Sequence, residues 1–294
     1  MPVTSTIPTI AGFWFGSDLS WLERLCIQSF LDNGHPFVLY VADRINGVPH
    51  GVETRPAADI FWPPPFDLRA ADRQRVAVFS DLFRLRVFQK TGFIWADLDA
   101  YCVRPFQFDS DFVFGASAQG TYLTGVLRLP DTSPTLAHML DFVTSANPTQ
   151  PWRGSRLRRD NQRRIASGDH WGIEDLPWGC SGPKALDFFL RQTGEDTHAL
   201  PACTLYPLDS KNIWKLHDPY VQTSDIERET VRSVHIFGHQ KKRIATEMSG
   251  VPIPGSYLER LCQRHGVDPA ANPIRPLTWM SPDRRSDQSR PSPS

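Results

Sequence analysis

The sequence lacks any excess of charge and any long apolar run. Its 294 residues include 32 basic and 32 acidic side chains, so the formal net charge is +0. A nucleic-acid-binding protein usually carries a basic excess, so we expect no nucleic acid among the partners. No stretch approaches the roughly 18 apolar residues of a membrane-spanning helix, and no spanning helix is expected.

Cysteine is scarce and shows no metal-binding pattern. The five cysteines are scattered and form no Cys-x-x-Cys pair, which argues against a zinc cluster and against a disulfide framework. This usage favours a reducing compartment. Residues 1–10 lack the basic and then apolar pattern of a signal peptide. We therefore expect a cytoplasmic protein, with attachment to a membrane surface left open.

Three short apolar runs predict buried strands. They cover residues 9–16, 37–41 and 93–96. Continuous apolar character over this length is typical of strands that are buried on both faces of a parallel sheet. Helical patterns separate the runs, and this alternation predicts an α/β fold with a mostly parallel sheet.

Two helices are predicted between these strands. Ser20 and Glu23 fit a capping box at the start of the first helix, with Asp18 as an alternative N-cap, and Gly34 ends it. The second helix covers residues 70–90, a helical pattern that contains no glycine or proline.

Two carboxylates, Asp97 and Asp99, follow the third apolar run directly. Ligands of parallel sheets gather at the carboxyl ends of the strands. Carboxylates this close raise each other's pKa unless a cation lies between them, and oxygen ligands suit Mg²⁺ or Mn²⁺. A solvated turn is the alternative interpretation.

Asp81 and Arg84 form a second polar pair on the predicted helix over residues 70–90. They are three residues apart and share one face. An exposed ion pair would be ordinary and worth little. Their neighbours, however, are apolar nearly all round the helix, as expected for a buried helix. A charged pair in that setting favours a binding site over an idle surface pair.

These residues resemble the signature of the DXD-containing sugar-binding glycosyltransferases. That group includes α-1,4-galactosyltransferases, initiating α-mannosyltransferases, capsule-synthesis enzymes and the glucosyltransferase domains of large bacterial toxins. Its pattern is Ser-Asp-x-x-Arg, a helix, a Gly-Gly turn, an aromatic strand and Asp-x-Asp. This chain has Ser80–Arg84 and then Thr91–Asp99, with Thr91-Gly92 in place of two glycines. Gly182-Pro183 resembles a Gly-Pro element that is often found in the second half of these glycosyltransferases.

The resemblance implies a GT-A-like fold with a Rossmann-like, mostly parallel central sheet flanked by helices. A single domain would cover residues 1–275, with a nucleotide-sugar-binding half at 7–115 and an acceptor-side half at 116–275. Residues 276–294 are rich in Pro, Ser, Arg and Asp without apolar periodicity, and we expect a disordered tail there.

Three more site residues follow from the resemblance. Trp14 would lie near the nucleotide base, although a core tryptophan is the alternative. His235 and Lys241 fit a closing His-x-x-Gly-x-x-Lys motif, in which the histidine completes the metal shell and the lysine binds the diphosphate. The usual Pro-Trp after the lysine is absent, and His235 is equally compatible with a core histidine on a strand.

The implied function is a metal-dependent glycosyltransferase of polysaccharide biosynthesis. It would move a hexose from a nucleotide-sugar donor, with a UDP-sugar favoured, to a glycan acceptor, with retention implied by the resemblance alone. Asp97 and Asp99 would hold Mn²⁺ or Mg²⁺. Asp81 would accept hydrogen bonds from sugar hydroxyls and Arg84 would donate them. The alternatives are a metal-dependent hydrolase or nucleotidyltransferase, and a catalytically silent carbohydrate-binding protein.

An arginine-rich segment lies in the second half of the chain. Residues 153–164 contain six arginines and are flanked by Trp152 and Trp171. The favoured interpretation is a solvated, mobile loop. The alternatives are a lid over the donor or a surface for an anionic acceptor or lipid headgroups, which would give peripheral membrane contact. The two tryptophans would stack on a sugar or simply pack.

Overall fold

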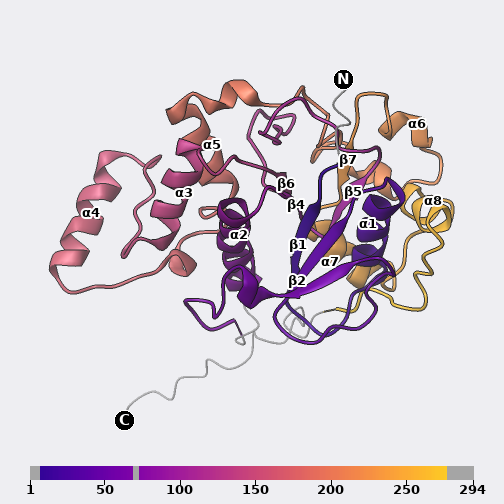
Figure 1. The fold of residues 1–294 in the computed structure, drawn as a ribbon, viewed down its shortest axis with the longest axis horizontal. Coiled ribbons are helices and arrows are strands. Elements are labelled where there is room, and N and C mark those ends of the chain that lie inside the picture. The colour runs from indigo at the N-terminus through magenta and orange to yellow at the C-terminus, as the bar shows by residue number, and fades with distance from the viewer. Residues whose placement is uncertain (1–6, 69–72, 277–294) are drawn as a thin grey trace, which may run out of the picture.

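A five-stranded sheet with the order β3-β2-β1-β4-β6 forms the centre of the protein (Figure 1). The structure is a computed structural model that describes residues 7–68 and 73–276. The expected start of the second helix at residues 70–72 and the expected tail beyond Pro276 lie outside the described residues.

Four strands of this sheet are parallel, and β6 is antiparallel to β4. The predicted strands and the α/β fold with a mostly parallel sheet are confirmed. A separate antiparallel pair is formed by β5 and β7, with Ala100 opposite His235. The strands are β1 (Ile10–Trp14), β2 (Phe37–Val41), β3 (Glu53–Pro56), β4 (Ile94–Ala96), β5 (Ala100–Cys102), β6 (Val126–Leu127) and β7 (Ser233–His235).

Helices α1 (Trp21–Asp32) and α2 (Arg73–Lys90) cover opposite faces of the sheet. Successive side chains of β1 point to opposite faces. Ile10 packs in the cluster that contains residues of α1, whereas Phe13 packs in the cluster that contains residues of α2. The central strands are therefore apolar on both faces, which explains their continuous apolar runs.

The start of α1 agrees with the predicted capping box. Ser20 is the N-cap, and its backbone N–H donates to the Glu23 carboxylate at 2.9 Å. The alternative prediction, that Asp18 is the N-cap, is wrong. The helix ends at Asp32, and Gly34 follows with φ +83°, a conformation that suits glycine.

The arginine-rich segment was expected to be a loop, and this expectation is wrong. It forms α4 over Ser155–Ala166, beginning after Gly154. Arginine, leucine, glutamine and alanine all favour helix, and no glycine or proline interrupts the twelve residues. In Figure 1, α3 and α5 stand beside α2, and α4 lies farther out on the same side.

The remaining helices complete the two flanks. Beside α2 lie α3 (Pro134–Thr144) and α5 (Pro183–Thr193), while α7 (Gly238–Glu247) and α8 (Tyr257–Arg264) share a core with α1. No described helix is both long and apolar enough to cross a membrane. Short helical turns are α6 (Thr223–Ile226), Ala57–Asp59, Ile173–Asp175, Glu195–His198 and Ile213–Leu216.

Candidate functional site

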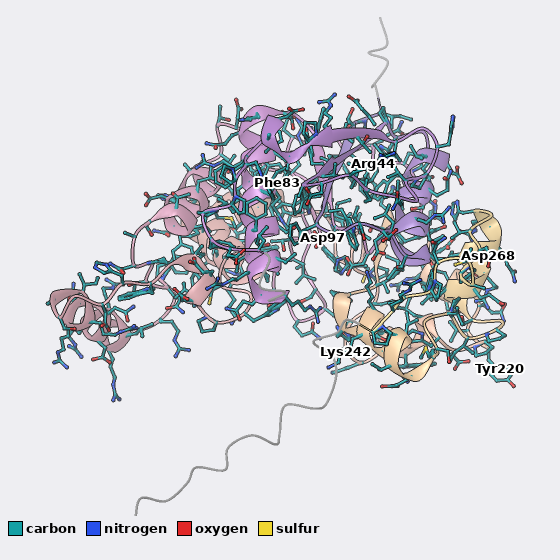
Figure 2. The ribbon with its side chains drawn as sticks, turned by 90° about the horizontal axis from the view of Figure 1, so that it is seen from below. Arg44, Phe83, Asp97, Tyr220, Lys242 and Asp268 are labelled. Atoms are coloured by element: carbon teal, nitrogen blue, oxygen red, sulfur yellow. The ribbon has the colours of Figure 1, made fainter. Side chains whose placement is uncertain are left out.

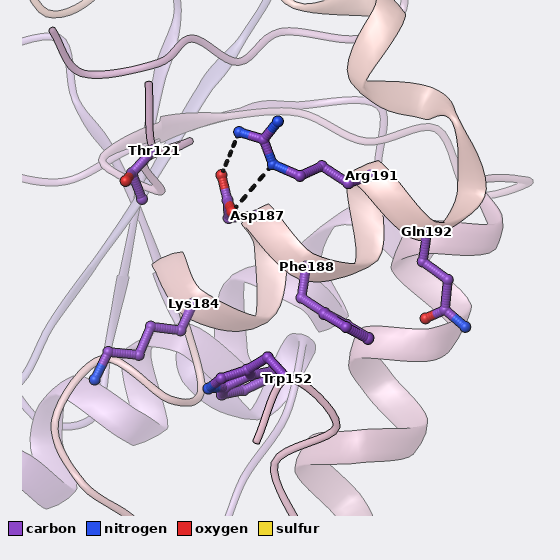
Figure 3. A pocket seen from close by; sticks show the side chains of 7 residues that line it. All are labelled: Thr121, Trp152, Lys184, Asp187, Phe188, Arg191 and Gln192. Atoms are coloured by element: carbon purple, nitrogen blue, oxygen red, sulfur yellow. Dashed lines mark hydrogen bonds and ion pairs between the residues drawn. The ribbon is translucent and has the colours of Figure 1, made fainter. Parts of the chain in front are cut away.

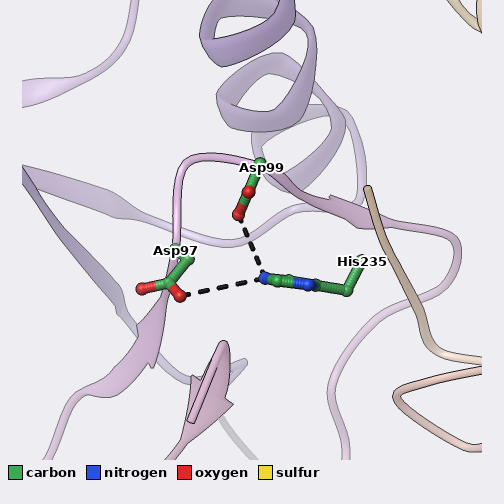
Figure 4. Close-up of side chains that lie close together, drawn as sticks. All are labelled: Asp97, Asp99 and His235. Atoms are coloured by element: carbon green, nitrogen blue, oxygen red, sulfur yellow. Dashed lines mark ion pairs between the residues drawn. The ribbon is translucent and has the colours of Figure 1, made fainter. Parts of the chain in front are cut away.

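Asp97, Asp99 and His235 meet at the carboxyl end of β4 (Figure 4). Asp97 follows the last residue of β4, and a tight turn joins it to β5, because the Ala100 N–H donates to the Asp97 carbonyl at 2.9 Å. His235 pairs opposite Ala100 in the β5–β7 ladder. Strand pairing therefore places the histidine next to a turn far earlier in the chain.

The three side chains form a compact set of candidate metal ligands, called the ligand set below. His235 Nε2 lies 3.0 Å from Asp99 Oδ1 and 3.8 Å from Asp97 Oδ2. One ligand atom from each residue lies within 4.8 Å of the other two. The two carboxylates suit Mn²⁺ or Mg²⁺, and the imidazole is a ligand typical of transition metals.

The ring of His235 supports this fit. It is only 9% exposed, and neither ring nitrogen has a hydrogen-bond partner among the described residues. The contact of Nε2 with Asp99 is an ion-pair distance without hydrogen-bond alignment. A buried nitrogen left unpaired is costly. A cation bound between the two aspartates would give this nitrogen a partner.

The pKa shifts at this cluster have clear electrostatic causes. Burial alone would lower the pKa of His235, but the negative charges of Asp99 and Asp97 outweigh it and raise the pKa to about 10. Burial alone would raise the pKa of Asp99, but the interaction with His235 and the charge of Lys241 together outweigh it, and the net shift is downward. Because a metal ligand must be neutral imidazole, metal binding here would release the His235 proton.

The two oxygens of Asp97 face different partners. Oδ1 accepts a hydrogen bond from Trp95 Nε1 at 2.8 Å and lies 3.1 Å from Arg84 Nη2. Oδ2 faces His235. One oxygen is thus held by the protein, which fixes the carboxylate and leaves the other directed at the ligand set. Figure 2 shows Asp97 near the middle of the molecule.

Arg84 connects the two predicted polar pairs. Its guanidinium lies 3.2 Å from Asp81 and 3.1 Å from Asp97, and it donates to the Thr124 carbonyl at 2.5 Å. It also lies 5.0 Å from the ring centroid of Trp95. Its side chain is 5% exposed. The structure therefore places Arg84 as a buried bridge, with its donors directed at protein oxygens.

Asp81 lies in a closely fitted pocket. Ser181 Oγ donates to its carboxylate at 2.6 Å, and burial raises its pKa, with only partial offset from Arg84. Gly182 lies so close that an added Cβ would meet both carboxylate oxygens at 2.7 Å. The Gly182-Pro183 element thus brings the start of α5 against Asp81.

Trp14 and Lys241 lie together beside the ligand set. Lys241 Nζ is 5.0 Å from the centroid of the Trp14 ring and forms an ion pair with the buried Glu23. Its positive charge also lowers the pKa of Asp99. Trp14 Nε1 is buried without a hydrogen-bond partner among the described residues.

Four residues at the site were not found from the sequence. Ser181 donates a hydrogen bond to Asp81, and the carbonyl of Thr124 accepts one from Arg84. Gly125 lies against His235, where a Cβ would meet Nε2 at 2.5 Å, and its carbonyl accepts from the Asp97 N–H at 2.7 Å. Glu23 was recognised only as a capping residue. No local sequence pattern identifies such residues, because their contacts are with residues far away in the sequence.

A groove of about 640 Å³ lies along α5, which starts next to Asp81 (Figure 3). Phe188 and Trp152 supply aromatic walls, with ring centroids 5.9 Å apart. A smaller cavity of about 330 Å³ shares Trp152 and Lys184 with it. The groove is lined by Thr121, Trp152, Lys184, Asp187, Phe188, Arg191 and Gln192.

The two tryptophans that flank the arginine-rich segment both pack against neighbours. Trp152 contacts Phe142 with ring centroids 5.5 Å apart, and it also lines the groove. The face of Trp171 is covered by the guanidinium of Arg164, which lies 4.4 Å from the ring centroid.

No protein family model and no curated protein matches the chain. Solved structures with similarity include one described as "PaToxG Glycosyltransferase", with 14% sequence identity and a TM-score of 0.41, over 76% of this chain and 84% of that chain. Similarity at this level supports no conclusion about activity, which has to come from the chain's own residues.

Proposed function

We propose that the protein is a metal-dependent glycosyltransferase that moves a hexose from a nucleotide-diphosphate sugar, with a UDP-sugar favoured, to a glycan acceptor. One observation carries this proposal. Arg84 bridges Asp81, from the sugar-binding half of the motif, to Asp97, from the metal-binding half. The residues that resemble the two halves of a DXD-type signature thus lie around one buried arginine, which supports the proposal.

Asp97 Oδ2, Asp99 and His235 would hold Mn²⁺ or Mg²⁺. The bound cation would act as a Lewis acid that neutralises the diphosphate leaving group. The protein fixes these ligands beforehand, through the hydrogen bond of Trp95 to Asp97 and the pairing of β7 with β5.

Asp81 is the residue we assign to the sugar. Its carboxylate would accept hydrogen bonds from hexose hydroxyls, while Ser181 and Arg84 hold its orientation. Since the donors of Arg84 are directed at Asp81, Asp97 and Thr124, we assign Arg84 mainly to positioning these groups. Retention of configuration remains a proposal from the motif resemblance.

Trp14 and Lys241 are proposed for the nucleotide end of the donor. The indole ring would lie against the base, and Lys241 would contact the diphosphate. The ion pair with Glu23 holds the lysine near Asp99, as its effect on the Asp99 pKa indicates.

The groove along α5 is proposed for the acceptor. Aromatic rings with adjacent charged and amide groups are suited to stacking on and hydrogen-bonding a saccharide. Ser181, which donates to Asp81, and Gly182 lead directly into α5, the helix that supplies most of the groove's lining residues. A hexose on Asp81 would then face an acceptor in the groove.

The two alternative functions make different demands. A two-metal hydrolase or nucleotidyltransferase would need further ligands, and within residues 7–68 and 73–276 the metal-type cluster is limited to Asp97, Asp99 and His235. A silent sugar-binding protein would bind donors without cleaving them.

The test is release of nucleoside diphosphate from a panel of UDP- and GDP-sugars by the purified protein with Mn²⁺. We expect release with one donor, its loss with EDTA or Asp99→Asn, and its persistence in the exposed control Asp109→Asn. Absence of metal-dependent release with every donor, or undiminished release by Asp99→Asn, would overturn the proposal.

A further inference from the structure

The arginine-rich helix α4 stands apart from the sheet at one end of the molecule (Figure 1). Its twelve residues span about 18 Å. Asn161 is its one buried side chain and donates to Thr149 Oγ1 at 3.0 Å. We call residues 153–164, which include most of α4, the basic arm.

The arginines of the basic arm are not spread evenly around α4. At about 100° per residue, Arg156, Arg159 and Arg163 fall within an arc of about 60°, nearly opposite Asn161. Asn161 faces the body of the protein, so these three arginines point away from it. The side chain of Arg163 is 81% exposed. They form an outward ridge of positive charge.

The charge of the basic arm is largely uncompensated. Its six arginines are offset only by Asp160, for a net charge of +5, so the rest of this net-neutral chain carries −5. Arg163 lies 3.6 Å from Asp160, and Arg164 lies 3.0 Å from Asp169. The other four have no ion pair within the described ranges. Like charges spaced three residues apart on a helix repel, so folding alone does not favour this ridge.

We propose that the outward face of α4 docks on an anionic lipid bilayer, with Arg156, Arg159 and Arg163 contacting phosphate and carboxylate headgroups. A helix is about 10–12 Å across, which exceeds the Debye length of about 8 Å at physiological salt. A membrane surface that touches this face therefore interacts electrostatically with the arginines. Salt screens it from the acidic residues in the rest of the chain, which lie farther away. This inference does not depend on the proposed activity.

Charge and shape favour a bilayer over a nucleic acid. A single strand is bound by aromatic rings that stack on bases. Here Trp171 is covered by Arg164, and Trp152 packs against Phe142 on the inner side. The outward ridge carries no apolar side chain, so docking is electrostatic and reversible by salt, without insertion into the acyl region.

The test is co-sedimentation of the whole protein with vesicles of phosphatidylcholine, alone or mixed with phosphatidylserine. We expect binding to the mixed vesicles only. Each arginine near the surface contributes about fivefold to partitioning, so the triple variant Arg156→Gln/Arg159→Gln/Arg163→Gln should bind about 100-fold more weakly. Raising the ionic strength from about 0.15 M to about 1 M, which shortens the Debye length to about 3 Å, should release the wild type.

A matched control separates the effect of the outward ridge on binding from the effect of the protein's net charge. Arg44→Gln/Lys90→Gln/Lys211→Gln removes three exposed cations from other elements and should keep wild-type binding. Circular dichroism would show that both triple variants are folded, and Arg159→Lys should bind like the wild type. Equal binding to neutral vesicles, equal loss in the two triple variants, or binding to a DNA oligonucleotide without binding to mixed vesicles would overturn the proposal.

Discussion

The guanidinium of Arg84, on α2, lies 3.1 Å from the carboxylate of Asp97, which follows β4 on the neighbouring sheet. The same group lies 3.2 Å from Asp81, one helical turn away. A single buried cation thus balances two carboxylates that the sequence separates into different elements. Its removal would leave the buried Asp81 without a cationic partner and Asp97 with His235 alone.

We expect Arg84→Met to lower the free energy of unfolding by about 3–5 kcal/mol, because breaking a buried ion pair leaves unpaired buried charge. Urea denaturation measures this change. Arg243→Met, which breaks the exposed pair with Glu247, is the control and should cost no more than about 1 kcal/mol. A similar small loss for Arg84→Met would contradict the bridging role.

Gly125→Ala should weaken metal binding while the fold is retained. The new methyl group would meet His235 Nε2 at 2.5 Å and push the ring away from Asp97 and Asp99. Displacement of His235, one of the three proposed ligands, should lower Mn²⁺ affinity by about 10–100-fold, the range seen when ligand orientation is lost. Titration followed by Mn²⁺ electron paramagnetic resonance measures this affinity.

The matched control is Gly154→Ala, where an added Cβ meets nothing within 4 Å. It should bind Mn²⁺ like the wild type. Wild-type affinity in Gly125→Ala would show that His235 is not needed in the ligand set.

Metal binding should also stabilise the folded protein. A ligand that binds only the folded state at 100 times its dissociation constant adds about 2.7 kcal/mol. We expect Mn²⁺ to raise the melting temperature of the wild type, EDTA to reverse the rise, and Asp99→Asn or His235→Ala to abolish it. A rise of the same size in either variant would exclude that residue as a ligand.

Acid should destabilise the fold through His35. Burial lowers its pKa below the ordinary 6.5, and its ring is held neutral, with Nδ1 2.8 Å from the Pro8 carbonyl and Nε2 accepting from the Phe106 N–H at 2.9 Å. Between this lowered pKa and 6.5, the unfolded state therefore binds more protons than the folded state. Stability from this group is present above pH 6.5 and is lost as the pH falls through the lowered pKa, by up to about 1.4 kcal/mol per pH unit.

Urea denaturation from pH 7 to pH 5 measures this slope. His35→Gln should be less stable at pH 7 but show a shallower pH dependence, whereas the exposed control His50→Gln should keep the wild-type slope. Burial also lowers the pKa of His217, which adds to the slope in the same direction. An unchanged slope in His35→Gln would rule out this origin.

The central strands were predictable because burial on both faces imposes apolar runs, as in residues 37–41. The edge strand β3 was not, since Glu53–Pro56 is mostly exposed and polar. Strands β5 and β6 have three and two residues, too few for any periodic signal. The prediction of a loop at residues 153–164 was wrong because it rested on the density of charge. Helix propensity decides the conformation of this exposed segment, and its residues favour a helix.

The aspartates of the site could be located from their position after a strand, and His235 from a motif resemblance. Gly125 and Ser181 could not, because their roles arise only from contacts with His235 and Asp81 across the fold. The bridging position of Arg84 was also not foreseen, since the sequence shows its partner on α2 but not the one after β4.

The pairing of β5 with β7 also sets when the site can form during synthesis. The turn with Asp97 and Asp99 leaves the ribosome well before His235, which lies far later in the sequence. Domains generally fold as units as the chain emerges from the ribosome. A nascent chain that stops before Ser233 would lack β7 and therefore one of the three candidate ligands, so the cluster can be complete only after the Ser233–His235 segment has been made.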